Sequence, residues 1–451
     1  MGNSYRKYTK AYDELALKTL KEFVAIDSTY DESTASKENP FGEGVSKALQ
    51  YFAEVALKDG FTVTNYDNMI VEACVGEGDK NITIMAHADV VPAGTGWDQN
   101  PFEMVVKDGV LHGRGVADDK GPLVACYYGL KALKDNGLLG NYKVRFLVGG
   151  NEESGSLCME HYFKTLKKPQ PTFGFSPDAD YPLIFAEKAI MGFEIKKDMH
   201  IKGVKSIRGG VASNAVIEKC DVVLEDEMAK KFYHHLKEKD IEIAVDGNMI
   251  SFIGKAAHGA TPEQGKNAGM IALTELAEFL NDKDLKVIVK GYTNLKGEGV
   301  NAGGYSKEMG NNSLNVGLLD YENDKFSMIV NFRYVETCNK EQLINNIKEA
   351  SKPFEFVLKG EAPMLFYPKD SVLVSTLLKV YQEEYDDYKT EPLAIGGGTY
   401  AKEADNTIAF GMQVPGWDAK MHSPGEQLKV EDLIKGMEVY AHAIIELGKK
   451  L

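Results

Sequence analysis

Short apolar runs alternate with helical stretches in the first part of the chain, and this alternation constrains the fold more than any other feature. Residues 82–86 and 143–148 are typical of buried strands, and residues 123–135 between them have the spacing of a helix. Because a helix that joins two strands crosses over the sheet, this order favours parallel pairing. We therefore predict an α/β fold with three layers and a mostly parallel central sheet.

The pattern changes near residue 188 and returns near residue 366. Between these positions we expect strands at 190–195, 249–253 and 326–332, and helices at 227–238, 269–281 and 340–349. This mixture predicts an inserted α+β domain over residues 188–365, placed to act as a lid. Because helices expected at 373–385 and 431–447 restore the first pattern, residues 1–187 and 366–451 are predicted to form one domain that the insert interrupts.

Composition limits the classes of partner. The chain of 451 residues is 43% hydrophobic, enough for a core without disulfide bridges, and its net charge of −15 argues against nucleic acid, which needs a basic surface. No apolar run approaches the roughly 20 residues that span a bilayer, so no membrane partner is expected. The five cysteines are scattered without a CxxC pair, and the first residues lack the apolar segment of a signal peptide. We expect a soluble, cytoplasmic protein with reduced thiols.

Acidic residues and histidines follow several of the predicted strands or lie in loops beside helices. Each position alone has an ordinary explanation, since a histidine near an aspartate is often a surface pair and acids at a helix start are favoured by the helix dipole. Two adjacent carboxylates nevertheless repel one another unless a cation is near. Because the carboxyl ends of parallel strands meet at one edge of a sheet, we expect these side chains to converge there. The positions are His87, Asp89, Asp118, Asp119, Glu152, Glu153, Asp178 and His422.

A pair of zinc ions can be assembled from these residues. His87 and Asp178 would hold one ion, and Glu153 and His422 the other, with a carboxylate between the two. Mixed histidine and carboxylate ligands suit zinc, with manganese or cobalt as substitutes. Three carboxylates and a bridging hydroxide balance the charge of two Zn²⁺ ions, and such pairs activate a shared water.

Six sequence blocks, in order along most of the chain, resemble a known family. They are HADVVPAGTGW, GRGVADDKGP, NEESGS, SPDA, GGGTYA and MHSPGE. Together they are similar to the dinuclear-zinc exopeptidases that include carboxypeptidase G, carnosinase and succinyl-diaminopimelate desuccinylase. Within that family the resemblance is strongest to the bacterial dipeptidase V type, an Xaa-His dipeptidase. One block would be weak evidence, but six in the same order are specific.

The resemblance implies a role for each residue near the zinc pair. Asp118 would bridge the two ions, because the family places the bridging aspartate directly after GRGxA, which favours Asp118 over Asp119. Glu152 would be the general base that takes a proton from the water between the ions and passes it to the leaving amine. Asp89 would orient His87 through the free nitrogen of its ring.

The resemblance also implies substrate contacts. Arg333 of the insert would hold a terminal carboxylate, and His258 and Asn214 would donate to the oxyanion, which gives His258 a catalytic role as well. Ile217 stands where relatives often have proline, so the match of Asn214 is less specific. The GGGT segment would present backbone N–H groups to a carboxylate, and a plain flexible loop is the alternative. The implied substrate contacts are Asn214, His258, Arg333, Gly397 and Thr399.

The sequence therefore predicts a zinc-dependent dipeptidase that hydrolyses short unblocked peptides, Xaa-His dipeptides among them. The alternatives are a deacylase of N-acyl amino acids with the same metal site, and a non-catalytic binding protein of the same fold. The resemblance to the dipeptidase V type implies a functional monomer, because an extra lid portion there stands in for a second subunit.

Overall fold

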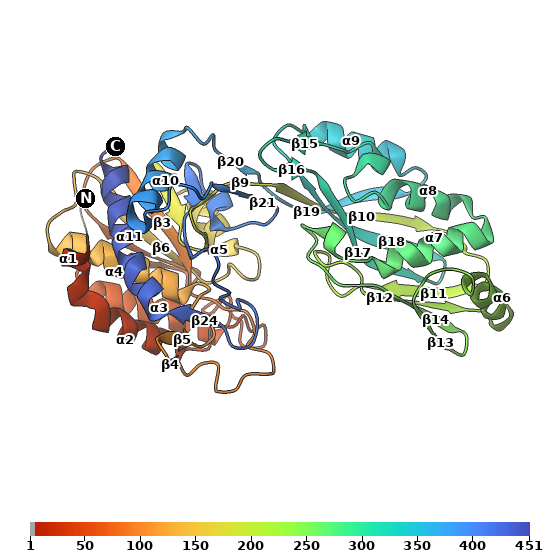
Figure 1. Ribbon diagram of the computed structural model, residues 1–451, viewed down its shortest axis with the longest axis horizontal. Coiled ribbons are helices and arrows are strands. Elements are labelled where there is room, and N and C mark those ends of the chain that lie inside the picture. Colours follow the sequence, from red (N-terminus) through yellow and green to blue (C-terminus); the bar gives the residue numbers. More distant parts are fainter. Residues whose placement is uncertain (1–4) are drawn as a thin grey trace. The chain divides into compact units, whose positions relative to one another are not determined.

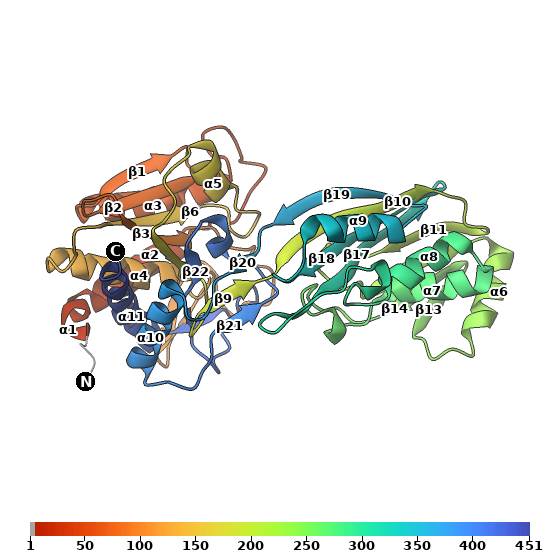
Figure 2. The ribbon, with the colours of Figure 1, turned by 90° about the horizontal axis from the view of Figure 1, so that it is seen from above.

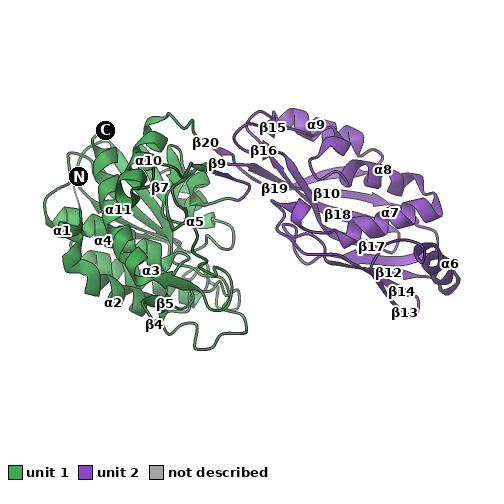
Figure 3. Cartoon of the chain, in the orientation of Figure 1, with its two compact units in different colours: residues 1–185, 367–393, 398–451 green, residues 186–366, 394–397 purple. Residues whose placement is uncertain are grey.

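The computed structural model describes residues 5–451, which form two compact units (Figure 3). Unit 1 contains the chain up to Phe185 together with Tyr367–Leu393 and Gly398–Leu451, and unit 2 contains Ala186–Phe366 and Ala394–Gly397. No helix among the described residues is long and apolar enough to cross a membrane. All five cysteines are free thiols.

Unit 1 is built on a mixed sheet, which runs in the order β1-β2-β6-β3-β7-β22-β9. Its central strands β3 and β6 lie side by side in Figure 1. The four central strands pair in parallel and the outer ones are antiparallel. The predicted α/β class is confirmed, with parallel pairing confined to the centre of the sheet. The strands are β1 (Thr62–Tyr66), β2 (Ile70–Val75), β3 (Asn81–His87), β6 (Lys143–Gly149), β7 (Phe173–Ser176), β22 (Thr407–Ala409) and β9 (Ile184–Glu187), and β9 also pairs with β20 (Leu365–Phe366) and β21 (Leu393–Ile395).

Helices cover both faces of this sheet, and two neighbouring residues of β6 show how. Phe146 contacts Phe52 of α3 and Tyr127 of α4 on one face. Arg145 points the other way, because successive side chains of a strand alternate, and its guanidinium donates to Tyr162 at 3.4 Å. The helices are α1 (Arg6–Thr9), α2 (Asp13–Val24), α3 (Glu43–Lys58), α4 (Lys120–Asp135), α5 (Leu157–Glu160), α10 (Val372–Tyr385) and α11 (Val430–Gly448).

Two small sheets complete unit 1. One has the order β24-β5-β4 and the other pairs β23 with β8. Because β24 pairs with β5 next to the GRGVADD segment, a segment near the C-terminus lies beside that loop. The strands are β4 (Val105–Lys107), β5 (Val110–His112), β8 (Ala179–Asp180), β23 (Met412–Gln413) and β24 (Gln427–Lys429).

Unit 2 is an antiparallel sheet of eight strands, in the order β13-β14-β12-β11-β17-β18-β10-β19, with helices packed on it (Figure 2). Alternate residues of β10 are buried, as expected for a sheet with one covered face. The longer strands are β10 (Ala189–Asp198), β11 (Val204–Gly209), β12 (Lys219–Leu224), β13 (Ile243–Asp246), β14 (Met249–Ile253), β17 (Ser313–Glu322), β18 (Lys325–Tyr334) and β19 (Glu355–Ala362). The helices are α6 (Asp226–Leu236), α7 (Ala268–Leu280), α8 (Lys283–Tyr292) and α9 (Lys340–Ala350), and β15 (Tyr305–Ser306) pairs with β16 (Gly310–Asn311).

Candidate metal centre

Three parallel strands of unit 1 end at the same edge of the sheet, and acidic residues or a histidine follow each of them. His87 is the last residue of β3 and is aligned with Gly149, the last residue of β6. Glu152 and Glu153 follow β6 after two residues, and Asp178 follows β7 after one. The predicted convergence at the carboxyl edge therefore exists in the fold.

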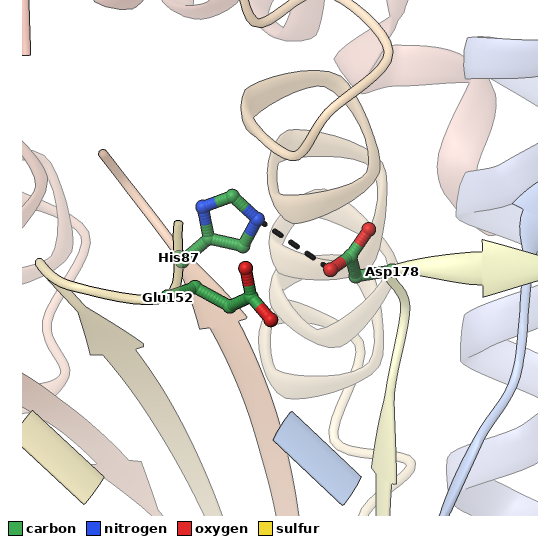
Figure 4. Close-up of side chains that lie close together, drawn as sticks. All are labelled: His87, Glu152 and Asp178. Carbon is green, nitrogen blue, oxygen red and sulfur yellow. Dashed lines mark ion pairs between the residues drawn. The ribbon is translucent and has the colours of Figure 1, made fainter. Parts of the chain in front are cut away.

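His87 is fully buried and lies among carboxylates. Its Nε2 is 3.0 Å from Oδ1 of Asp118 and 3.5 Å from Oδ2 of Asp178. Figure 4 shows His87 and Asp178 facing one another across a space that the carboxylate of Glu152 also borders. One ligand atom of each of these three residues lies within 4.8 Å of the other two.

His422 approaches the same cluster from a loop near the C-terminus. Its Nε2 is 2.8 Å from Oδ2 of Asp118 and 3.1 Å from Oε1 of Glu153. Asp118 therefore offers one carboxylate oxygen to each histidine, His87 on one side and His422 on the other. The His422 side chain is 55% exposed, so the cluster is open to solvent on this side.

Asp89 fixes the turn that carries the two glutamates. Its Oδ1 accepts a hydrogen bond from the backbone N–H of Glu152 at 3.0 Å, and its Oδ2 accepts one from Glu153 at 3.1 Å. The Nδ1 of His87 lies 3.0 Å from the backbone oxygen of Asp89 and 3.4 Å from its carboxylate. Asp89 thus contacts Nδ1 of His87 and binds the backbone of both glutamates, a contact that the sequence did not predict. Its orienting role toward a metal-bound His87 stays a prediction.

Two further acids support the cluster, and sequence reasoning gave neither a role. The Oδ2 of Asp119 accepts a hydrogen bond from the backbone N–H of His87 at 3.1 Å. Glu426 is buried and binds the backbone of the loop that carries Asp118. The signal for Glu426 was its place at the end of the MHSPGE block, four residues after His422.

The charge distribution of the cluster fits divalent cations. Burial raises the pKa of Glu152, Glu153 and Asp178, and the charges of neighbouring carboxylates raise it further. Hydrogen bonds to Asp118 and Glu153 raise the pKa of His422 to about 10. Carboxylates that resist ionisation beside a histidine that keeps its proton indicate an excess of negative charge, which bound cations would compensate.

The same atoms form overlapping sets of metal ligands. Besides the set of His87, Glu152 and Asp178, ligand atoms of His87, Asp118 and Glu153 lie within 4.8 Å of one another. Histidine nitrogen with carboxylate oxygen is a donor set that zinc, manganese and cobalt accept. The residues present therefore fit the predicted metals, while the division of ligands between two ions stays a prediction.

A third group of one histidine and two acids lies in unit 2 and differs from the two ligand sets of unit 1. His235 Nε2 is 3.0 Å from Glu275, and Glu278 is near both. Lys239 lies between the acids, with its Nζ 2.9 Å from Glu278 and 3.5 Å from Glu275. Because the lysine already supplies a cation there, we interpret this group as an ion-pair network.

Arg333 is a buried cation of unit 2 that lies on β18. Its Nε donates to the side-chain oxygen of Asn331 at 2.9 Å, and its Nη1 donates to the backbone oxygen of Gly396. Both acceptors are neutral, and burial lowers the pKa of Arg333 to about 10. A buried guanidinium with neutral acceptors is suited to an anionic ligand such as a carboxylate.

His258 and Asn214 are neighbours in unit 2. Ala215 and His258 form an isolated β-bridge, and the N–H of Gly259 donates to the backbone oxygen of Asn214 at 2.6 Å. The Nδ1 of His258 accepts a hydrogen bond from Ala260 at 3.3 Å, which leaves Nε2 as the ring donor. Burial and the charge of Arg333 lower the pKa of His258, so its ring is neutral near pH 7. Their predicted contact with an oxyanion stays a prediction.

The Thr399 side chain caps a short turn. Its hydroxyl accepts a hydrogen bond from the N–H of Ala401 at 3.2 Å, and this caps the short 3₁₀ turn Tyr400–Glu403. Thr399 belongs to unit 1 and Gly397 to unit 2. Their predicted contact with a substrate carboxylate remains a prediction.

Comparison with known proteins assigns the family. Residues 83–446 match the sequence profile of Peptidase family M20/M25/M40, a span that contains every residue of the candidate metal centre. The chain belongs to this peptidase family. A Bacillus subtilis protein provisionally named a dipeptidase is 34% identical over 96% of this chain and 97% of its own length. A Staphylococcus aureus protein with the same kind of name is 31% identical over 98% of this chain and 99% of its own length.

Solved structures of M20 peptidases and other enzymes share the fold. The di-peptidase Dug1p of Saccharomyces cerevisiae has a TM-score of 0.59 at 16% identity, with 98% of each chain covered. Human carnosine dipeptidase 1 has a TM-score of 0.56 at 15% identity, again with 98% of each chain covered. At these identities the comparison supports the fold alone.

The role of Asp89 in this M20 site can be tested by hydrogen exchange. We expect Asp89→Ala to speed the amide exchange of Glu152 and Glu153 roughly 10- to 100-fold, because a hydrogen bond to a charged acceptor contributes about 1.5–3 kcal/mol. Asp387→Ala is the matched control, since Asp387 accepts hydrogen bonds from two backbone N–H groups elsewhere in unit 1. Unchanged protection of both glutamates in Asp89→Ala would show that Asp89 does not hold the turn.

Proposed function

We propose that this M20 peptidase is a metal-dependent dipeptidase with two zinc ions, for which manganese or cobalt can substitute. One observation supports it above all: Asp118 offers one oxygen to His87 and the other to His422. Each histidine also faces a second carboxylate, Asp178 for His87 and Glu153 for His422. This arrangement supports one shared and two separate sets of ligands. The names of the sequence relatives support dipeptides as the substrate class.

When bound, the two ions supply Lewis-acid polarisation of the scissile carbonyl and activation of water. Glu152 is the residue we assign to proton transfer. Its carboxylate borders the space between His87 and Asp178, and Asp89 fixes its backbone. We infer that Glu152 takes a proton from the attacking water and gives it to the leaving amine, while Glu153 remains a ligand with His422.

We assign Arg333 to the free carboxylate of the substrate. Its neutral acceptors leave the positive charge of the guanidinium uncompensated at close range. His258, whose Nε2 is a donor, is assigned to the oxyanion together with Asn214. A requirement for a free carboxylate makes the enzyme an exopeptidase, and Xaa-His dipeptides are included in the proposed range.

The rival within the same site is a deacylase of N-acyl amino acids, because these substrates also carry a free carboxylate next to an amide. A substrate panel on zinc-loaded protein separates the two. We expect turnover of unblocked dipeptides, including Xaa-His, that stops on chelation and returns with zinc, and little turnover of N-acetyl or N-succinyl amino acids. Turnover of the N-acyl compounds alone would replace the dipeptidase by the deacylase.

We also propose that the chain works as a monomer, because its long insert supplies both Arg333 and His258. Light scattering at the assay concentration should give the mass of one chain. Activity that appears only in a dimeric fraction would contradict this proposal.

Changing Glu152 to glutamine tests the proton-transfer role. Glu152→Gln should lower kcat about 10²- to 10⁴-fold, because it removes the group that moves the proton while it keeps the size of the side chain. Its metal content should stay equal to that of the unaltered protein. Glu160→Gln, an exposed acid eight residues away, is the matched control and should keep full activity. Loss of metal from Glu152→Gln would instead make Glu152 a ligand.

Changing Arg333 to alanine tests the carboxylate contact. Arg333→Ala should raise KM for dipeptides roughly 10- to 100-fold, as expected when charged hydrogen bonds of about 1.5–3 kcal/mol are lost. Dipeptides with an amidated C-terminus should be poor substrates already and should lose little more. Arg208→Ala, which removes an exposed arginine of the same sheet, is the matched control. Equal losses on free and amidated substrates would exclude the contact.

A further inference from the structure

A buried carboxylate joins the loop that carries Asp118 to the loop that carries His422. Glu426 is fully buried, and its Oε1 accepts hydrogen bonds from the backbone N–H groups of Gly115 at 3.0 Å, Ala117 at 2.9 Å and Asp118 at 3.1 Å. Its Oε2 accepts from Gly115 at 3.1 Å. Because Glu426 follows His422 by four residues, one side chain fixes both loops relative to each other.

Only an ionised carboxylate matches this set of partners. Every group that contacts Glu426 is a donor, including Nη1 of Arg114 at 2.6 Å. A glutamine of the same size would place its NH₂ group, which cannot accept, against one of these donors. Four donors, three backbone N–H groups and the Arg114 guanidinium, thus converge on one buried carboxylate, and a purely space-filling role does not explain this arrangement.

Arg114 extends the connection to a third loop. Its Nη2 lies 3.5 Å from the backbone oxygen of Pro92, and its guanidinium lies over the ring of Trp97 at 5.3 Å. Both belong to the segment that follows His87 and Asp89 in the chain. The pair of Arg114 and Glu426 is thus in contact with all three loops that carry His87, Asp118 and His422.

We propose that Glu426 and Arg114 are positioning residues that hold Asp118 between His87 and His422 and thereby set the affinity of unit 1 for divalent ions. This inference rests on the proposed metal centre. Glu426 itself binds the backbone N–H of Asp118, whose side chain contacts both histidines, so a shift of this N–H moves a ligand shared by both ions. Residues that orient ligands in this way typically contribute 10- to 100-fold in metal affinity.

The test is a titration of chelator-treated protein with Co²⁺ in competition with a chelator, read by the visible absorption of bound Co²⁺. We expect Glu426→Gln to weaken Co²⁺ binding roughly 10- to 100-fold and to change the absorption spectrum, because the coordination itself changes. Glu384→Gln is the matched control: Glu384 is also an acid of unit 1 with a side chain only 9% exposed and two basic partners, His442 at 2.8 Å and Lys435 at 2.6 Å, but it lies outside the site. The control should bind Co²⁺ like the unaltered protein.

The outcomes separate the inference from the proposal on which it rests. If the unaltered protein binds no Co²⁺, the metal centre itself is wrong. If it binds Co²⁺ and Glu426→Gln binds it equally well with the same spectrum, the positioning role is wrong. Should Glu426→Gln fail to fold, Arg114→Lys keeps the positive charge but cannot reach Pro92 and Glu426 together. Arg114→Lys should also weaken Co²⁺ binding, and an unchanged affinity would overturn the inference.

Discussion

Electrostatic repulsion among five carboxylates at the carboxyl edge of the unit 1 sheet is the constraint on which the site depends. Burial adds to the free-energy cost of this arrangement, because the charged form of each acid is less stable away from water. The acids are Asp118, Asp119, Glu152, Glu153 and Asp178, and their charges act on one another. Such an arrangement persists only when positive charge or N–H groups are directed at it. We propose that bound cations supply the positive charge, with the two histidines as neutral ligands.

Backbone N–H groups also stabilise the acids of this region. Asp89 accepts two of them from the turn after β6, Asp119 accepts one from the end of β3, and Glu426 accepts three from the loop before α4. Asp89, Asp119 and Glu426 therefore each accept from the backbone, whereas Asp118, Glu153 and Asp178 direct their oxygens at histidine nitrogens. The site therefore separates into acids that hold the loops and acids that are free to bind cations.

Unit 2 has the opposite electrostatic character at its candidate site. Arg333 is buried with neutral acceptors, and His258 beside it is kept neutral by burial and by the guanidinium. Such a site favours an anion, whereas the cluster in unit 1 favours cations.

The sequence predicted the long, periodic elements well. The helix expected at 340–349 is α9 (Lys340–Ala350), and His87 stands at the end of a strand as expected. The strand β2 (Ile70–Val75) was missed because it has no regular alternation of apolar and polar residues. The helix α8 (Lys283–Tyr292) was missed because its β-branched Val-Ile-Val core favours strand by local propensity, whereas the Asp282 cap starts a helix.

The candidate metal ligands could be predicted from the sequence because acids and histidines recur at the ends of predicted strands. The roles of Glu426, Arg114 and Asp119 could not be predicted, because they arise from contacts between loops far apart in the chain. Glu426 and Arg114, for example, are separated by 312 residues. A local motif such as MHSPGE contains Glu426 but does not show which atoms it contacts, so only the folded structure gives its role.

Anomalous diffraction at the zinc absorption edge, from crystals of zinc-loaded protein, would show whether Asp118 lies between two ions. We predict two peaks on either side of Asp118, one next to His87 and Asp178 and the other next to His422 and Glu153. Two-metal sites place such ions about 3.5–4 Å apart. A single peak, or peaks away from Asp118, would contradict the account.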